Sequence, residues 1–212
     1  NPVSRRVIST QSAVLPVATA DFTGDGRPDI LRYHHDAGAR THQLVLLVGR
    51  PPRPSHPDEV RFLRPRVVAD TDVVRGIKPD RVIFGRFTSG PELDIVFTRS
   101  RPGDFASELI VLVNDGSGRF STAGDRAVNR YHAVATPSSP AGPAARQQFL
   151  AHTRRGEYVT LQLTDSGSIA QAQPVITDFR GGSLYLSGAT PAIQAADFNG
   201  DGRDELVVLR GN

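Results

Sequence analysis

The chain has 212 residues, a formal net charge of +3 at pH 7, 20 Gly and 16 Pro, and only 7% aromatic residues. This length is sufficient to bury a sizeable core, and the abundance of turn-forming residues is typical of an all-β protein rather than a helical one. The absence of cysteine excludes disulfides, thiol catalysis and thiolate metal sites.

The basic residues give no sign of a nucleic-acid site. All 25 of them are arginine except Lys78, and they form no Lys/Arg-rich run of the kind that contacts phosphates. We therefore expect a solvated basic surface and no nucleic-acid partner. No apolar run reaches the roughly 18 residues of a membrane span. The sequence begins at Asn1, contains no methionine and shows no leader peptide, so we expect a processed or excised piece of a longer chain.

The first predicted repeat covers residues 15–66. Short apolar runs bounded by Gly, Pro and Asp predict its strands at residues 15–22, 29–33, 42–48 and 60–63. The last of these follows a proline-rich connection, and residues 67–79 are predicted as the linker to the next repeat. Residues 1–14 are predicted as the outer strand of a preceding or a closing repeat.

The second predicted repeat, residues 80–124, aligns with the first at a shift of 65 residues. The shift places Asp94 on Asp29, so the same strand arrangement is expected. It also places the cation Arg86 on Asp21, which predicts that the second repeat has lost any metal site of the first.

The third predicted repeat, residues 131–176, has a proline and small-residue stretch where the first has an acidic loop. The fourth, residues 192–212, contains a second acidic loop and stops after two strands. The equivalent Phe22 and Phe198 are 176 residues apart, or three repeats of about 59 residues. The chain is therefore expected to hold about three and a half repeats.

Two nine-residue loops carry the chemistry of this sequence. Each has oxygen-bearing side chains at its first, third, fifth and ninth places and glycine at its fourth and sixth. Alternate side chains of a tightly curled loop converge, glycine permits the curl, and hard oxygen donors suit Ca²⁺. We predict a Ca²⁺ site in each loop, with the backbone carbonyl of the seventh residue as a further ligand. The predicted ligands are Asp21, Thr23, Asp25, Arg27 and Asp29 in the first loop and Asp197, Asn199, Asp201, Arg203 and Glu205 in the second.

The sequences around the loops distinguish among the known kinds of calcium loop. An EF-hand has flanking helices and a Glu at the twelfth place, but Arg32 and Val208 stand there and apolar strand-like runs flank both loops. These loops share their pattern with the FG-GAP/VCBS repeat family. That pattern is an apolar strand, the sequence Asp-Phe-Asn-Gly-Asp-Gly, two further residues, an acidic residue and a second strand. Residues 196–208 resemble it almost residue for residue, and residues 20–31 resemble it with Thr23 in place of Asn. The resemblance implies β-propeller blades like those of the integrin α-subunit head, Ca²⁺ in the loops and a binding role.

We therefore expect an all-β chain that forms one β-propeller region of four-stranded blades. Propellers close with typically 4–8 blades. The three and a half blades present predict a partial propeller, or a segment of a larger one that depends on the remaining blades. The alternative is a small ring whose last blade is completed by an N-terminal strand at residues 3–9.

The expected function is non-catalytic: a binding, adhesion or scaffold module with an extracellular protein or glycan as its partner. The alternative is an accessory propeller domain of a secreted hydrolase or lyase whose catalytic part lies outside these residues. Calcium loops of extracellular modules bind at about 10⁻⁴–10⁻³ M, which suits external calcium, so we expect a secreted or cell-surface protein. No catalytic residue is predicted, because the acidic pair Asp104 and Glu108 has no nearby nucleophile. No zinc site is predicted either, because His34 and His35 point to opposite faces of a strand.

Overall fold

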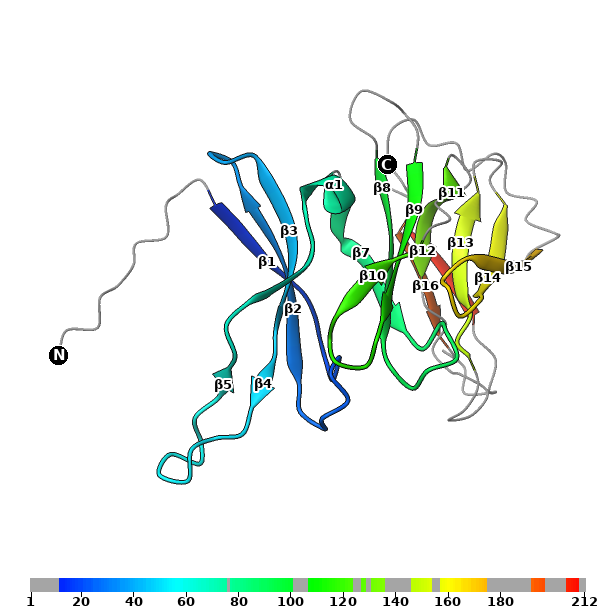
Figure 1. Ribbon diagram of the computed structural model, residues 1–212. Coiled ribbons are helices and arrows are strands. Elements are labelled where there is room, and N and C mark those ends of the chain that lie inside the picture. Colours follow the sequence, from blue (N-terminus) through cyan, green and yellow to red (C-terminus); the bar gives the residue numbers. More distant parts are fainter. Residues whose placement is uncertain are drawn as a thin grey trace.

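The computed structural model describes residues 12–75, 77–100, 107–123, 127–128, 131–135, 146–153, 157–174, 192–196 and 205–209. Within these ranges the chain is built of β-strands and one short helix, α1 (Thr71–Val74), which confirms the predicted all-β class. Successive antiparallel sheets follow one another along the chain and stand side by side (Figure 1). No helix in the described part is long and apolar enough to cross a membrane.

The first sheet has four antiparallel strands. They are β1 (Ser12–Ala20), β2 (Asp29–Asp36), β3 (Thr41–Leu47) and β6 (Arg66–Ala69), in that spatial order. Side chains alternate across the sheet, as the pleat requires. Leu31 and Tyr33 on β2 are therefore buried, while Ile30 and Arg32 between them are partly exposed.

The fourth strand of this sheet differs from the sequence prediction. Residues 60–63 were expected to supply it, but β5 (Arg61–Phe62) pairs with β4 (Gly49–Arg50) in a separate two-stranded ribbon. The strand that pairs with β3 is β6, in the stretch predicted as a linker. The rest of that stretch holds α1 and the start of β7 (Ile77–Gly85). The ribbon leaves the sheet because five prolines between residues 51 and 65 remove the amide hydrogens that a sheet strand needs.

The second sheet lies in the middle of the described structure. Its path is β7, β8 (Asp94–Ser100), β9 (Ser107–Asn114) and β10 (Phe120–Thr122), and β11 (Ala127–Val128) also pairs with β9. Both of its faces are buried. Its side chains that join the core shared with the first sheet include Ile95, Phe97, Ile110 and Leu112. Those that join the core shared with the third sheet include Val96, Leu109 and Val111.

The third sheet repeats the same order of strands. It consists of β12 (Tyr131–Ala135), β13 (Phe149–Thr153), β14 (Tyr158–Leu163) and β15 (Ile169–Pro174), all antiparallel. A last antiparallel pair, β16 (Ala192–Ala196) and β17 (Glu205–Leu209), follows it. The predicted strand at residues 3–9 lies outside the described residues.

The first strands of successive sheets lie next to one another. β1 contacts β7, β7 contacts β12, and β12 contacts β16. The first-strand edges of these sheets therefore adjoin one another, and among the described residues the first and second sheets, and the second and third, share an apolar layer.

Candidate metal centre

The first acidic loop connects β1 to β2 at one end of the first sheet. It turns through two glycines in the left-handed region, Gly24 at φ 69° and Gly26 at φ 79°. A side chain at either position would meet no other atom within 4 Å, so backbone conformation and not space demands glycine there.

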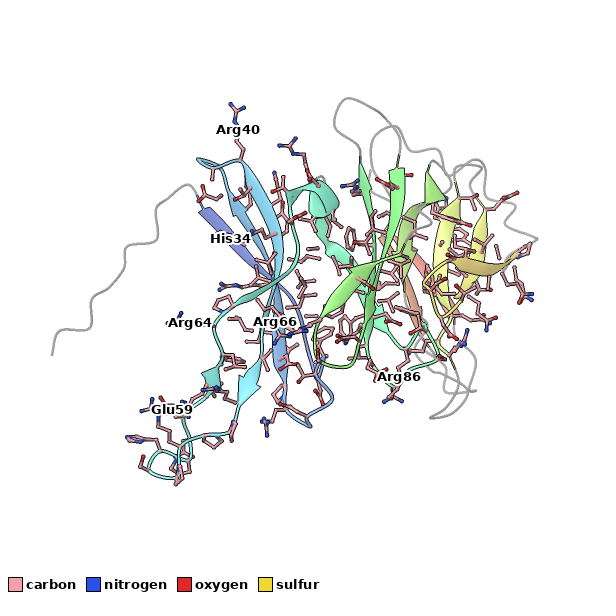
Figure 2. The ribbon with its side chains drawn as sticks, in the orientation of Figure 1. His34, Arg40, Glu59, Arg64, Arg66 and Arg86 are labelled. Carbon is pink, nitrogen blue, oxygen red and sulfur yellow. The ribbon has the colours of Figure 1, made fainter. Side chains whose placement is uncertain are left out.

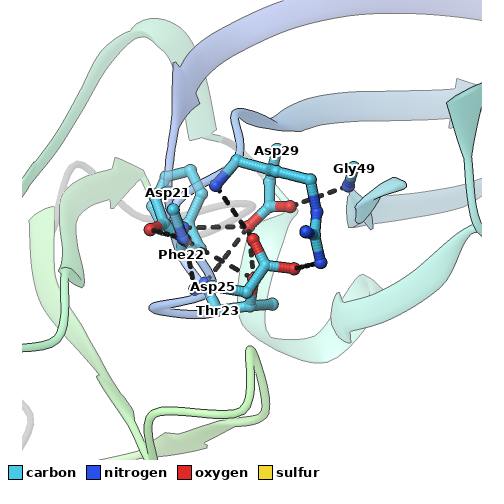
Figure 3. A network of polar contacts seen from close by, with 8 residues as sticks. Asp21, Phe22, Thr23, Asp25, Asp29 and Gly49 are labelled. Atoms are coloured by element: carbon cyan, nitrogen blue, oxygen red, sulfur yellow. Dashed lines mark hydrogen bonds and ion pairs between the residues drawn. The ribbon is translucent and has the colours of Figure 1, made fainter. Parts of the chain in front are cut away.

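Asp29, the ninth residue of the loop, is completely buried, and both of its carboxylate oxygens accept hydrogen bonds (Figure 3). Oδ2 accepts from the N–H groups of Phe22 at 2.9 Å and Thr23 at 3.1 Å, and from the Thr23 hydroxyl at 3.3 Å. Oδ1 accepts from the N–H of Gly49, just after β3, at 2.8 Å. Asp29 thus ties the start of the loop to the second and third strands of its sheet.

Asp21 and Asp25 lie on the exposed side of the loop and bind its backbone. Asp21 accepts from the N–H groups of Asp25 at 3.2 Å and Gly26 at 2.8 Å. Asp25 accepts from the N–H of Arg27 at 2.9 Å and forms an ion pair with its guanidinium at 2.8 Å. These partners are solvent-exposed, so water can replace them at little cost when the carboxylates turn to another ligand.

Of the five predicted ligands in this loop, three side chains are suited to a calcium ion, whereas Asp29 has a structural task. Asp21, Thr23 and Asp25 supply hard oxygen donors on an exposed, glycine-containing loop, as Ca²⁺ prefers. Asp29 already accepts four hydrogen bonds, about as many as a carboxylate has lone-pair sites. In the described part of the chain, no three His, Asp or Glu side chains converge as a metal-binding group. Within this loop, Asp21, Asp25 and Asp29 each accept hydrogen bonds from backbone N–H groups.

The second repeat shows that the Asp29 arrangement exists without the other acidic residues. Asp94 Oδ2 accepts from the N–H and the hydroxyl of Thr88, both at 2.9 Å, and Oδ1 accepts from the N–H of Asn114 at 3.0 Å. The 65-residue shift relates Thr88 to Thr23 and Asn114 to Gly49. Burial raises the pKa of Asp94, although the hydrogen bonds from Asn114, Thr88 and Phe87 oppose the shift. The ninth-place aspartate is thus a structural part of the strand–loop–strand unit.

Sequence reasoning missed Gly49 and Asn114. A Cβ at Gly49 would lie 2.5 Å from the carbonyl oxygen of Pro28, so only glycine allows this approach. Asn114 connects two sheets, because its Nδ2 donates to the carbonyl of Phe22 in the first loop at 2.8 Å. The ring of Phe22 is buried against Phe84 and Phe120 of the second sheet. The 65-residue alignment of the first two repeats was the signal that could have identified both positions.

The same kind of anchor recurs at the next junction between sheets. The β14–β15 turn of the third sheet reaches back to the second, where Asp165 Oδ1 accepts from the N–H of Ser89 at 3.1 Å. Arg86, which replaces the first ligand of the calcium loop, is exposed, and its N–H donates to the Gln147 side chain at 2.8 Å. Loops at this end of the first and second sheets are therefore held by the sheet that follows.

The second acidic loop lies outside the described residues, and so do its predicted ligands at positions 197, 199, 201 and 203. Glu205, the fifth, opens β17 and pairs through its backbone with Ala196. The small-residue and proline stretch predicted at residues 138–145 also lies outside the described residues.

Two other groups of polar residues have clear structural roles. The rings of His35 and His42 stack across β2 and β3 with centroids 4.3 Å apart, and the Tyr33 hydroxyl contacts His42 Nδ1 at 2.5 Å. Burial, together with the charges of His35 and Arg75, lowers the pKa of His42. Glu108, one of the acidic residues considered for catalysis, is buried and forms an ion pair with Arg99 at 2.7 Å. 

Comparison with models of protein families, with curated proteins and with solved structures finds no match to this chain.

Proposed function

We propose that the chain is a calcium-stabilised β-propeller region of the FG-GAP/VCBS type, which acts as a non-catalytic binding or adhesion module outside the cell. The observation that carries this proposal is the order of the sheets. Four-stranded antiparallel sheets follow one another, their first strands lie side by side, and the middle sheet is buried on both faces. A propeller arranges its blades in this way around a central axis.

The acidic loop supports the calcium part of the proposal. Asp21, Thr23 and Asp25, with the Arg27 carbonyl, hold Ca²⁺ in the first loop, and Asp29 positions these ligands by closing the loop around its own oxygens. The homologous residues of the second loop hold a second ion. Bound Ca²⁺ supplies positive charge that neutralises the clustered carboxylates, and so stiffens the connection between the first two strands of a blade.

The binding role rests on where the loops lie. The β1–β2 and β7–β8 loops and the β9–β10 turn gather at one end of the sheets (Figure 1). Loops held on a rigid scaffold are the usual carriers of recognition. The partner in this proposal is an extracellular protein or glycan.

Calorimetric titration with Ca²⁺ tests the proposal. We expect two Ca²⁺ per chain in wild type, one in each acidic loop, and one in Asp21→Asn/Asp25→Asn. The second repeat should add no ion, because Arg86 replaces the first ligand there. Asp58→Asn/Asp72→Asn is the matched control: it removes two exposed carboxylates that lie outside both loops and should leave two ions bound. No heat of binding in wild type, or three or more ions, would contradict the assignment of the loops.

A further inference from the structure

The two-stranded ribbon of the first sheet has no counterpart in the other two. It comprises residues 49–62, with β4 and β5 as its strands, and it lies between β3 and β6. In the second sheet the same connection, from third to fourth strand, is a tight turn at residues 115–119, and in the third sheet it is a tight turn at residues 164–168. The ribbon projects away from all the sheets (Figure 1).

The ribbon has a defined conformation. At its tip the N–H of His56 donates to the carbonyl of Arg53 at 2.9 Å, and at its base the N–H of Leu63 donates to the carbonyl of Val48 at 2.8 Å. Four prolines between residues 51 and 57 limit the conformations of the unfolded segment. A partner that binds the ribbon therefore loses little affinity to ordering it.

The ribbon exposes both apolar and cationic groups. Residues 50–60 are all exposed, and Val60, at 81% of its maximum, is the more exposed of the two large apolar residues that stand out in the described structure. Arg64, just beyond β5, is exposed and points away from the sheets (Figure 2). Arg66 instead turns toward the second sheet, where it donates to the Ser117 carbonyl at 2.9 Å.

The strand pairing of the ribbon places two cations against each other. Arg50 is directly opposite Arg61 across β4 and β5, so both side chains leave the same face. Like charges in this position repel each other and lower the stability of a hairpin. Glu59 offers partial compensation, at 3.8 Å from Arg61 and 3.7 Å from Arg53. No carboxylate lies within ion-pair distance of Arg50 in the part of the chain that the structure describes.

We propose that this ribbon is the docking element for an acidic polypeptide segment, whose carboxylates bind the facing pair Arg50 and Arg61 while an apolar side chain packs on Val60, the residue before Arg61. Carboxylates match the planar fork of guanidinium groups and remove the repulsion between the facing arginines. The exposed valine favours a polypeptide over an anionic polysaccharide, because only the polypeptide brings an apolar side chain next to its anionic groups. The proposal gives the binding module proposed above a partner class, and it rests on that function but not on its calcium part.

Fluorescence anisotropy tests this proposal with a labelled peptide in which glutamates flank two leucines. A peptide with glutamines in place of the glutamates, and a labelled sulfated polysaccharide, serve as comparison probes. We expect the acidic peptide to bind wild type, and Arg50→Gln to weaken binding about tenfold, the effect of one charge-assisted hydrogen bond. Arg40→Gln is the matched control, because Arg40 is an exposed arginine at the opposite end of the first sheet and should leave binding unchanged (Figure 2).

Two further measurements separate docking from a structural role. Val60→Ser should weaken peptide binding, whereas Val67→Ser, at a half-exposed valine of β6, should not. The thermal midpoint of Arg50→Gln should equal or exceed that of wild type, because the substitution removes a repulsion. A lower midpoint with unchanged peptide affinity would assign Arg50 a structural role and overturn the proposal.

The peptide-binding assay and the calcium titration test the ribbon proposal and the calcium proposal separately. No binding of the acidic peptide to wild type, or binding of the polysaccharide alone through the same arginines, would overturn the ribbon proposal. The anisotropy assay is run both in Ca²⁺ and in chelator. If the titration detects no bound calcium, peptide binding to the ribbon can therefore still be measured and interpreted. Normal calcium stoichiometry without peptide binding would refute the ribbon proposal alone.

Discussion

Replacing Asp29 by asparagine should destabilise the protein far more than the same change at Asp25, although the two residues belong to one loop. Asp29 is fully buried and accepts hydrogen bonds on both oxygens, from Phe22 and Thr23 on one and from Gly49 on the other. Asparagine retains one oxygen and presents an NH₂ group in place of the second. One set of buried N–H groups therefore loses its acceptor in either orientation of the amide.

The size of the effect follows from these contacts. A buried donor without an acceptor costs about 1–3 kcal/mol, and the remaining hydrogen bonds lose their charge assistance. We expect Asp29→Asn to lower the free energy of unfolding by about 3 kcal/mol. For a chain of this size the thermal midpoint should fall by about 6–12 °C. Asp25→Asn, at an exposed carboxylate, should change the free energy of unfolding by no more than about 0.5 kcal/mol when calcium is absent.

Thermal unfolding followed by circular dichroism in chelator provides the measurement, since chelator removes any contribution of bound calcium. Asp94→Asn should reproduce the loss seen with Asp29→Asn, because Asp94 accepts the equivalent hydrogen bonds in the second sheet. Equal midpoints for Asp29→Asn and Asp25→Asn in chelator would refute the structural role assigned to the ninth-place aspartate.

Two further predictions concern the first sheet. Gly49→Ala should lower the free energy of unfolding by about 1–3 kcal/mol, because its Cβ would lie 2.5 Å from the Pro28 carbonyl oxygen; a thermal midpoint like that of wild type would show that the backbone adapts freely. The second prediction concerns pH. The pKa of His42 is lower in the folded protein than its ordinary 6.5, so on acidification the unfolded chain takes up the proton first. The stability that neutral His42 contributes is therefore present above about pH 6.5 and is lost as the pH falls through the lowered pKa. The thermal midpoint of wild type should therefore fall more steeply between about pH 7 and 5 than that of His42→Asn, and parallel curves would contradict this.

The all-β class was predictable from the sequence because it depends on local patterns. Apolar runs such as residues 42–48, bounded by turn residues, identify strands whatever their partners are. The fourth strand of the first sheet was not predictable in this way. β6 pairs with β3 across the inserted ribbon, so its identity depends on a pairing between segments distant in sequence.

The candidate site was predictable in composition but not in the division of its tasks. Alternating oxygen-bearing residues mark the loop, yet the pattern does not distinguish a side chain that faces an ion from one that faces amide hydrogens. The distinction required the burial of Asp29 and the N–H of Gly49, which begins β4, distant from the loop in sequence. The presence of Asp94 in a repeat without the other acidic residues was the one sequence signal that pointed to a structural role.

Thermal unfolding in millimolar Ca²⁺ and in chelator is the most direct test of the proposed calcium-stabilised propeller. An ion at ten times its Kd that binds only the folded protein adds about 1.4 kcal/mol per site. Two sites should therefore raise the thermal midpoint by about 6–11 °C in wild type. Asp21→Asn/Asp25→Asn and Asp201→Asn should each lose about half of this increase, and Mg²⁺ at the same concentration should give much less of it. Identical midpoints for wild type in Ca²⁺ and in chelator would contradict the account.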